Sequence, residues 1–385
     1  MDLRESVLAM ARAEGFELAR IAAAGDLPEA RKTARVALDA GHLAGMAWMT
    51  GEWIERATTP DRFLPGARSI VVVALPNHSP EPELPVEGGP ARGRIARYAR
   101  GRDYHRVFET RLRRIARRIR EELGADARAT VDYGPLLERP YAELAGLAWR
   151  GKSTMALVPG FGPWVMLGVV ATTLALQPDE PLRKSCGSCT RCIAACPTGA
   201  IAADGHVVDS RLCISYQTIE NRGPIPRELR SKFGARVFGC DDCLDACPVG
   251  AGRFESHTDF LPASPEDATP GLAELLPLDD AAFTERFRGR AIMRAKRDGL
   301  LRNACVALGN VGTPGDLDAL TGALTDRSPT VRGHAAWAVA ALANRHGLTT
   351  IARTPLENAL VLEHDSAARE EFVLALAELR RDTDG

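Results

Sequence analysis

Hydrophobic residues in the first half of the chain follow two patterns: short apolar runs, and apolar positions spaced three or four residues apart. Residues 69–75 form a β-branched run that ends at Pro76, which is typical of a buried strand. Residues 1–60 show the wider spacing and predict helices. Residues 104–123 predict an amphipathic helix with a strongly basic face, because pairs of arginines separate its apolar positions. Those apolar positions are Val107, Leu112, Ile115 and Ile119.

Further strands are expected at residues 127–131, 155–158 and 165–176. Strands that alternate with helices indicate an α/β or α+β domain. Residues 154–177 carry no charge, and the stretch is long enough to cross a bilayer. Prolines and glycines interrupt this stretch, however, so two buried strands around a Gly/Pro loop explain it better than a membrane span.

The last third of the chain is expected to be helical. Residues 256–284 look like a linker with short helical pieces, because several prolines and acids fall within them. A pattern that begins at Arg302 is echoed from Arg332 and again from Arg369, at spacings of 30 and 37 residues. Short helix-pair repeats of the HEAT type produce such echoes. An irregular helical cap is the alternative.

Composition places the chain among ordinary soluble globular proteins, with 45% apolar and 26% charged residues over 385 positions. The net charge is −1, from 49 basic and 50 acidic side chains, so any binding of nucleic acid must come from local basic patches. The first residues lack the apolar segment of a secretory signal. We therefore expect a cytoplasmic protein of two or three domains.

Eight of the nine cysteines lie within residues 186–247, in two related runs. The first run is Cys186-x2-Cys189-x2-Cys192-x3-Cys196-Pro197, the bacterial ferredoxin pattern. The second is Cys240-x2-Cys243-x3-Cys247-Pro248, which lacks its first cysteine, and Cys213 is the spare thiol that can complete it. In such runs three thiolates from one tight loop hold one cubane, and the fourth points to the other cluster.

Ferredoxin logic therefore predicts two [4Fe-4S] clusters. Cluster one is assigned to Cys186, Cys189, Cys192 and Cys247. Cluster two is assigned to Cys196, Cys213, Cys240 and Cys243. A pair of zinc sites is the alternative, because zinc also uses paired C-x2-C elements, but the run that ends in Cys-Pro favours iron–sulfur. The ninth cysteine, Cys305, occupies an apolar helical position and is expected to be a buried, inert thiol.

Two clusters in series indicate one-electron transfer to a redox centre in a neighbouring domain. The first domain contains no G-x-G-x-x-G sequence after a strand and no Walker motif, so generic motifs do not identify its cofactor.

Several longer motifs carry a family resemblance. They are Arg97-Tyr98-Ala99-x-Gly101-x-Asp103-Tyr104-His105, Val131-Asp132-x-Gly134-Pro135-x-Leu137-Glu138-Arg139, Ala145-Gly146-Leu147-x-Trp149-x-Gly151-Lys152, Cys213-Ile214-Ser215-Tyr216-x-Thr218-Ile219-Glu220, Phe238-Gly239-Cys240-Asp241-x-Cys243 and Arg302-Asn303-Ala304. In this order they cover nearly the whole chain. The sequence resembles the epoxyqueuosine reductase family, cobalamin-dependent iron–sulfur enzymes of queuosine biosynthesis.

The resemblance implies an α+β multidomain protein. An N-terminal α/β cobalamin-binding domain would span residues 1–178, a ferredoxin-like two-cluster domain 179–255, and a linker with a HEAT-like helical domain 256–385. The implied reaction reduces epoxyqueuosine at the tRNA wobble position to queuosine, with an external low-potential electron donor and a monomeric enzyme. The implied cobalamin contacts are Arg97, Tyr98, Asp132, Lys152, Ser153, Ser215, Gly239 and Asp241.

Asp132 matches the position of the family's proton donor. Taken alone, an Asp before Gly134-Pro135 is most simply a cap of its own turn. A carboxyl group donates a proton near pH 7 only if a buried, apolar setting raises its pKa, so we expect a raised pKa here. The chain departs from the family pattern at Tyr133, at Ser153 and at residues 249–250.

Two basic stretches are candidates for tRNA binding. Residues 286–302 carry seven basic side chains, and the predicted tRNA contacts among them are Arg286, Arg288, Arg290, Arg294, Lys296 and Arg297. Arg222 is a further candidate by resemblance. Residues 92–120 form a second patch, for which tRNA binding and a solvated helix face remain equally open between residues 111 and 120.

Two other functions compete with the tRNA-modifying reductase. A reductive dehalogenase-like enzyme would share the cobalamin and the two clusters, but it would act on a small organohalide and carry an export signal. A non-catalytic electron carrier or scaffold would bind clusters without cobalamin.

Overall fold

The computed structural model describes residues 2–82 and 89–381 and divides into two compact units. Unit 1 is built from Met1–Pro80, Arg102–Arg211 and Asp241–Leu261. Unit 2 is built from Glu81–Gly101, Leu212–Cys240 and Pro262–Gly385. The predicted domain boundaries at residues 178 and 255 assign each cofactor to one stretch of the chain. The division into two units does not test that assignment, so these boundaries stay a prediction.

Unit 1 is organised around a four-stranded sheet in the order β1-β2-β7-β4. The strands are β1 (Leu18–Ala23), β2 (Ser69–Pro76), β7 (Val165–Thr172) and β4 (Ala127–Thr130). Every neighbouring pair is antiparallel. The expectation of an α/β first domain was therefore wrong, because alternation of strands and helices along the chain does not determine strand direction. The unit is α+β.

The expectation that residues 1–60 are helical is confirmed only in part. Helices α1 (Leu3–Ala13), α2 (Pro28–Asp39) and α3 (Gly51–Ala57) lie there, but β1 separates α1 from α2. Leu18 pairs with Ala74, and Ala23 pairs with Ser69. Alanine-rich sequence has low intrinsic preference for strands, so pairing with the buried β2 decides the conformation of this segment.

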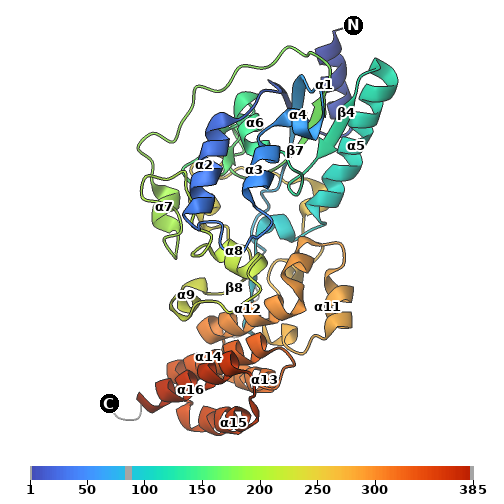
Figure 1. Cartoon of the computed structure of the whole chain (residues 1–385). Helices are drawn as coiled ribbons and strands as arrows, with labels where there is room; N and C mark the ends of the chain where they lie inside the picture. The colour runs from blue at the N-terminus through green and yellow to red at the C-terminus, as the bar shows by residue number, and fades with distance from the viewer. Residues whose placement is uncertain (1, 83–88, 382–385) are drawn as a thin grey trace. The chain divides into compact units, whose positions relative to one another are not determined.

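Helices cover both faces of the sheet. The predicted helix over residues 104–123 is confirmed as α5 (Tyr104–Leu123), and α5 packs on β7 and β4, with α1 beside it (Figure 1). The opposite face packs on α6 (Glu138–Leu144). Alternate residues of β2, such as Ile70 and Val72, share a hydrophobic core with Tyr141 and Ala142 of α6. The sheet is therefore buried on both faces.

The uncharged stretch 154–177 forms strands, as predicted. β6 (Ala156–Leu157) pairs with β5 (Trp149–Arg150), and a Gly/Pro loop leads from β6 into β7. Within the described residues no helix combines the length and hydropathy that a membrane span requires. The other short helices of unit 1 are α4 (Pro60–Phe63), α7 (Arg191–Ala195), α10 (Asp242–Asp245) and η3 (Thr258–Phe260).

Unit 2 is mainly helical. Its only described strands, β3 (Arg94–Ile95) and β8 (Arg236–Phe238), form a short parallel pair. The short helices are η1 (Arg97–Ala99), α8 (Ile214–Ile219), α9 (Arg227–Arg230), η2 (Ser231–Phe233), η4 (Pro265–Asp267), η5 (Ala273–Leu275), α11 (Asp280–Phe287) and η6 (Ala291–Ala295). The C-terminal helices are α12 (Lys296–Val311), η7 (Pro314–Asp316), α13 (Leu317–Ala323), α14 (Pro329–His346), α15 (Thr349–Leu362) and α16 (Ser366–Arg381).

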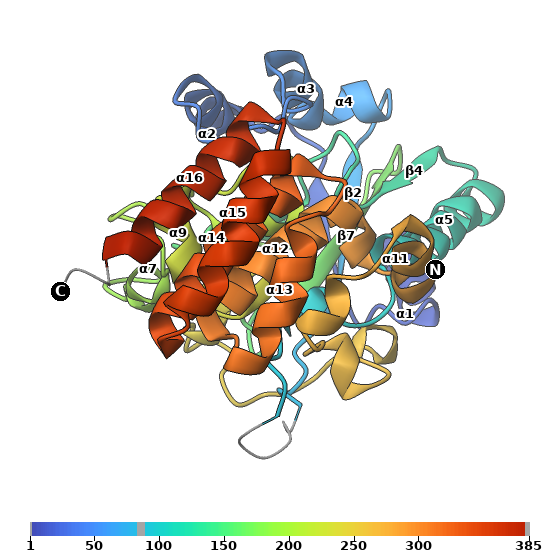
Figure 2. The ribbon, with the colours of Figure 1, turned by 90° about the horizontal axis from the view of Figure 1, so that it is seen from below.

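The three echoes of the repeat fall on α12, α14 and α16. These helices pack in succession, α12 against α14 and α14 against α16, as the orange and red ribbons of Figure 2 show. Cys305 lies within α12 and is fully buried, and burial raises the pKa of its thiol. The prediction that Cys305 is buried is therefore confirmed.

The Arg302-Asn303 pair at the start of the repeat holds the segment around α8. The Arg302 guanidinium is buried and donates to the backbone carbonyls of Gln217, Asn221 and Gly223 at 2.6–2.8 Å. The Asn303 amide donates to the carbonyls of Thr218 and Val237 at 2.8 Å. Burial lowers the pKa of Arg302 to about 9. This pair is therefore a structural clamp on backbone groups and offers no surface for a ligand.

Candidate functional site

Four cysteines of unit 1 line one cavity of about 120 Å³. They are Cys186, Cys189, Cys192 and Cys247, the set that ferredoxin spacing assigns to cluster one. Cys192 lies on α7, and Cys247 follows α10, which packs against α7. Two short helices therefore bring together thiols that are as many as 61 positions apart in the sequence.

Two thiols of this cavity, those of Cys192 and Cys247, resist ionisation without a bound cation. Burial raises the pKa of Cys192 and of Cys247, and the neighbouring cysteines raise both further. Thiolates at such sites are the ligands of metal centres, whose positive charge compensates them. Among the described residues, no three His, Cys, Asp or Glu side chains converge as they would around a single metal ion. The donor set of four sulfur atoms fits an iron–sulfur cluster.

The cysteines assigned to cluster two fall in both units. Cys196 and Cys243 belong to unit 1, whereas Cys213 and Cys240 belong to unit 2. In unit 1 the Cys196 sulfur accepts a hydrogen bond from the Ala200 N–H at 3.2 Å. In unit 2 Cys213 is the N-cap of α8. This ligand set stays a prediction.

Asp132 lies on a tight turn after β4, with its side chain 62% exposed. Its φ of +47° is a left-handed conformation that non-glycine residues seldom adopt. Two residues on, a Cβ at Gly134 would lie 1.6 Å from Thr130 Oγ1, so only glycine fits there. The Asp132 N–H donates to the Glu138 carboxylate at the start of α6. The turn therefore presents the Asp132 carboxylate outward from the sheet edge.

The first residues of α5 hold that carboxylate. Tyr104 Oη donates to Asp132 Oδ2 at 2.6 Å, and His105 Nε2 lies 3.3 Å from the same oxygen. His105 Nδ1 lies 2.7 Å from Oδ1 of Asp103, the N-cap of α5. In the described structure the Asp132 side chain thus bonds to α5, which argues against a role as a cap of its own turn. Sequence reasoning had assigned no role to Tyr104 or His105, although both stand in a quoted motif.

The electrostatics of this group reverse one expectation. Partial loss of hydration against α5 raises the pKa of Asp132, but hydrogen bonds from His105 and Tyr104 outweigh this desolvation and leave the pKa below its usual value. The prediction of a raised pKa was therefore wrong. Burial lowers the pKa of His105, but its bonds to Asp103 and Asp132 raise it to about 9. At neutral pH the pair is therefore a carboxylate beside an imidazolium.

A second carboxyl group beside the turn, that of Glu138, holds a proton more readily than Asp132 does. Burial, together with the negative charge of Asp132, raises the pKa of Glu138 to about 7. Arg139 and Arg106 are the nearby cations, since Arg139 lowers the pKa of Asp132 and Arg106 that of Asp103.

The predicted cobalamin contacts lie in different surroundings. Lys152 and Ser153 line the four-cysteine cavity, and Lys152 Nζ donates to the Gly187 carbonyl at 2.9 Å. Asp241, also in unit 1, is the N-cap of α10. The structure therefore places Lys152 and Ser153 beside the predicted cluster one.

In unit 2 the remaining predicted contacts gather near β8. The Tyr98 and Phe238 rings lie 6.2 Å apart, and Gly239 follows with a φ of +72°. A Cβ on Gly239 would lie 2.5 Å from the Ala96 Cβ, so the backbone passes there only as glycine. Ser215 lies on α8, one turn before Thr218, whose hydroxyl accepts from the Gly239 N–H. Arg97 is buried and pairs with Glu81 at 2.8 Å.

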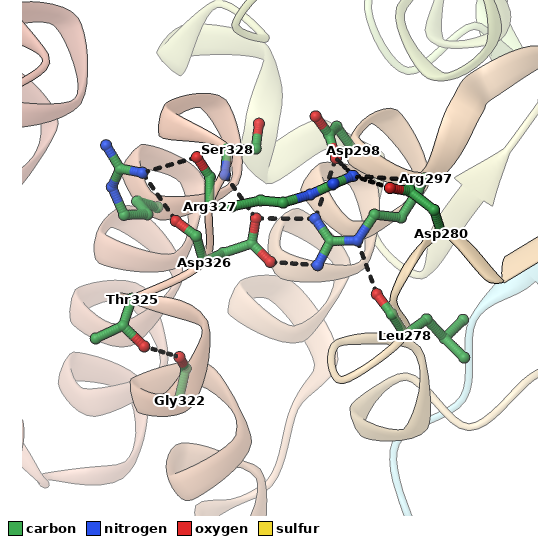
Figure 3. Close-up of polar contacts among 10 residues, drawn as sticks. Leu278, Asp280, Arg297, Asp298, Gly322, Thr325, Asp326, Arg327 and Ser328 are labelled. Carbon is green, nitrogen blue, oxygen red and sulfur yellow. Dashed lines mark hydrogen bonds and ion pairs between the residues drawn. The ribbon is translucent and has the colours of Figure 1, made fainter. Parts of the chain in front are cut away.

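The predicted tRNA cations differ in how accessible they are. Arg297 is buried, its guanidinium held by Asp326, Asp298 and the Leu278 carbonyl (Figure 3). Arg290 pairs with Asp267, Arg294 pairs with Glu220, and Arg286 lies 4.0 Å from Glu274. Arg222 donates to the Ala295 carbonyl at 3.1 Å. Arg288 and Lys296 are exposed. Arg297 is thus committed to structural ion pairs, which leaves the exposed cations as the stronger candidates.

Comparisons with known proteins match the same regions. A family model described as a 4Fe-4S double cluster binding domain matches residues 185–250. A model described as epoxyqueuosine reductase QueG, DUF1730, matches residues 57–133, which end beside Asp132. An epoxyqueuosine reductase of Gloeobacter violaceus is 41% identical over 310 residues, which are 78% of this chain and 94% of the relative. One of Escherichia coli K12 is 38% identical over 322 residues, 82% of this chain and 83% of the relative.

Two solved structures are similar over nearly the full length. A crystal structure of an epoxyqueuosine reductase with an epoxyqueuosine-modified tRNA-Tyr stem loop has a TM-score of 0.90, with 31% identity and coverage of 98% of this chain and 99% of that one. A Bacillus subtilis epoxyqueuosine reductase, solved with an aspartate catalytic loop swung out of the active site, has the same TM-score and identity and covers 98% of both chains.

An α+β fold with a segment that matches a double-cluster model defines this chain as an iron–sulfur protein. The sequence identities and coverages above also identify the family within this class of protein. The chain belongs to the epoxyqueuosine reductase family and is an oxidoreductase. Membership decides against the electron carrier and against the reductive dehalogenase-like alternative.

Proposed function

We propose that this enzyme reduces epoxyqueuosine at the wobble position of tRNA to queuosine, with two [4Fe-4S] clusters and cobalamin. Family membership supports the reaction, and the relative crystallised with a modified stem loop supports tRNA as the substrate. The observation that carries the proposal is the exposed Asp132 carboxylate held by Tyr104 and His105. The electron donor is external, and the enzyme acts as a cytoplasmic monomer.

The proposed electron path uses both cysteine sets. The cavity formed by Cys186, Cys189, Cys192 and Cys247 supports the assignment of cluster one, and Lys152 on its wall places a cation beside the cluster. Cobalamin, when bound, supplies a low-potential cobalt centre that acts on the epoxide. Its contacts in this proposal are the eight residues that the resemblance implies: Arg97, Tyr98, Asp132, Lys152, Ser153, Ser215, Gly239 and Asp241. The family motifs support this assignment.

The proposed chemistry also consumes protons. Removal of an epoxide oxygen as water breaks two carbon–oxygen bonds and takes two electrons and two protons. Asp132 is a carboxylate in the resting site, so it does not store the first proton. His105 stores it as an imidazolium, stabilised by Asp103 on its other ring nitrogen. As charge develops on the departing oxygen, the first proton passes from His105 through the Asp132 carboxylate to that oxygen, and the second proton, which completes the water molecule, comes from solvent.

A pH profile tests the storage of this proton. Because the pKa of His105 is raised, its proton is present below about pH 9 and lost as the pH rises through that value. Turnover by the wild-type enzyme should therefore be sustained to about pH 9 and fall above it. Asp103→Asn should move this alkaline limb to lower pH, because the imidazolium loses a charged partner while Asn still caps α5.

One result of this experiment would contradict proton storage by His105. An alkaline limb that is identical in wild type and Asp103→Asn would show that His105 does not store the proton. Circular dichroism and iron content should be unchanged in the variant, since Asp103 contacts no predicted cluster ligand.

The function itself is tested by nucleoside analysis. Reduced enzyme, reconstituted with iron, sulfide and cobalamin, is incubated with tRNA that carries epoxyqueuosine. We expect queuosine to appear at the expense of epoxyqueuosine, and omission of cobalamin should abolish the conversion. Conversion without cobalamin would overturn the cofactor assignment, and no conversion by fully loaded enzyme would overturn the reaction.

A further inference from the structure

An arginine-lined groove lies in unit 1 away from the residues assigned so far. It has a volume of about 430 Å³ and runs between α5 and β4. Five arginines line it: Arg113, Arg114, Arg117, Arg120 and Arg128. The other lining residues are alanines, and no acidic side chain among the described residues lines the groove. The concentration of positive charge in a concave surface favours a polyanionic ligand.

Two of these arginines are held in place by the fold. Arg120 Nη1 donates to the Ala127 carbonyl at 2.6 Å, which bridges α5 and β4. Arg128 Nη1 donates to the Phe63 carbonyl at 2.9 Å, and its guanidinium lies 4.6 Å from the centre of the Phe63 ring. These contacts leave other N–H groups of both guanidiniums available, since each carries five donors.

The outer arginines are only loosely engaged. Arg113 is 70% exposed, and its guanidinium lies 3.3 Å from Glu109. Arg117 is 60% exposed and lies 3.9 Å from Glu121. Arg114 pairs with Glu14 at 3.1 Å. Exposed pairs of this kind contribute little to stability, so a phosphate can replace the carboxylates at small cost.

Both walls of the groove lead to Asp132. Helix α5 begins with Tyr104 and His105, which bond to the Asp132 carboxylate, and β4 ends two residues before Asp132. At 1.5 Å per residue, Arg113 lies about 14 Å and Arg120 about 24 Å along α5 from Tyr104. Nucleic-acid phosphates advance about 3.4 Å along a helical strand. The groove therefore lies about four to seven nucleotides from a base at Asp132.

We infer that this groove binds the phosphate backbone of the substrate RNA, in the stem that adjoins the modified loop. The inference rests on the proposed function and extends it to a second contact region on the RNA. It assigns a role to the basic face of residues 111–120, which the sequence alone leaves undecided. Each arginine that meets a phosphate contributes to affinity through release of counterions, so its removal weakens the salt dependence.

The test compares two double variants that remove equal charge. Arg113→Gln with Arg117→Gln alters the groove, whereas Arg118→Gln with Arg12→Gln alters an α5 arginine and an α1 arginine that do not line it. Binding of an unmodified anticodon stem-loop is measured from low to moderate salt. The groove variant should bind more weakly, and the slope of log Kd against log salt should fall by about 2. The control should keep the wild-type slope.

Further arms separate the possible failures. A single-stranded oligonucleotide of the loop alone should bind wild type and groove variant equally. Equal stem-loop slopes for wild type and groove variant, or an equal loss in the control, would overturn the inference but leave the proposed function intact. Failure of the wild type to bind any RNA would overturn the proposed function as well. Competition by inorganic phosphate alone, without a stem-loop effect, would point to a small anion.

Discussion

Asp132→Asn is expected to lower the rate of epoxyqueuosine reduction by roughly 100-fold or more, the usual scale for a positioned proton donor. The amide keeps the size of the carboxylate and can still accept from Tyr104, but it cannot pass a proton from His105 to the departing oxygen. The measurement is single-turnover formation of queuosine with fully reduced enzyme, so that electron supply is not limiting.

Two controls accompany this variant. Iron content and cobalamin loading should match the wild type, because the substitution removes no thiol. Asp126→Asn, before β4 and away from this hydrogen-bonded group, should leave turnover unchanged. Near-normal product formation by Asp132→Asn that carries its full iron and cobalamin would remove Asp132 from the mechanism. The side chain would then act only as a cap of its own turn.

The second large effect concerns the clusters. Anaerobically reconstituted wild-type protein should carry about eight irons, as two [4Fe-4S] clusters require. Cys247→Ala should lose cluster one and about half of the iron, because it removes one of the four thiols of the 120 Å³ cavity. Cys213→Ala should lose cluster two instead. Either variant should abolish turnover, since one-electron transfer through the series is interrupted.

Two further measurements make this test specific: spectroscopy of the surviving cluster, and the iron content of a variant at the ninth cysteine. Electron paramagnetic resonance of the reduced proteins should show a different surviving cluster in Cys247→Ala and in Cys213→Ala. Cys305→Ala should keep the full iron content, because Cys305 is buried in α12. Retention of about eight irons by Cys213→Ala would show that the ligand assignment is incorrect.

Local patterns in the sequence determined much of this protein. The β-branched run of β2 and the amphipathic period of α5 are properties of neighbouring residues, and both elements form where they are predicted. Cysteine spacing is equally local, because one tight loop must present three thiols to one cubane. For that reason the sequence alone predicts the kind of cluster, before any fold is known. Family motifs then identify the reaction, since they are specific as an ordered set.

Tertiary structure decided what depends on partners far apart in the chain. Strand β1 forms because it pairs with β2, although its alanine-rich sequence favours a helix. The pKa of Asp132 is lowered because the start of α5 places His105 and Tyr104 against it, and no local pattern predicts that meeting. Arg297 is drawn into a buried ion pair by Asp326, 29 positions away. Charge state and accessibility are properties of surroundings, so only the folded chain determines them.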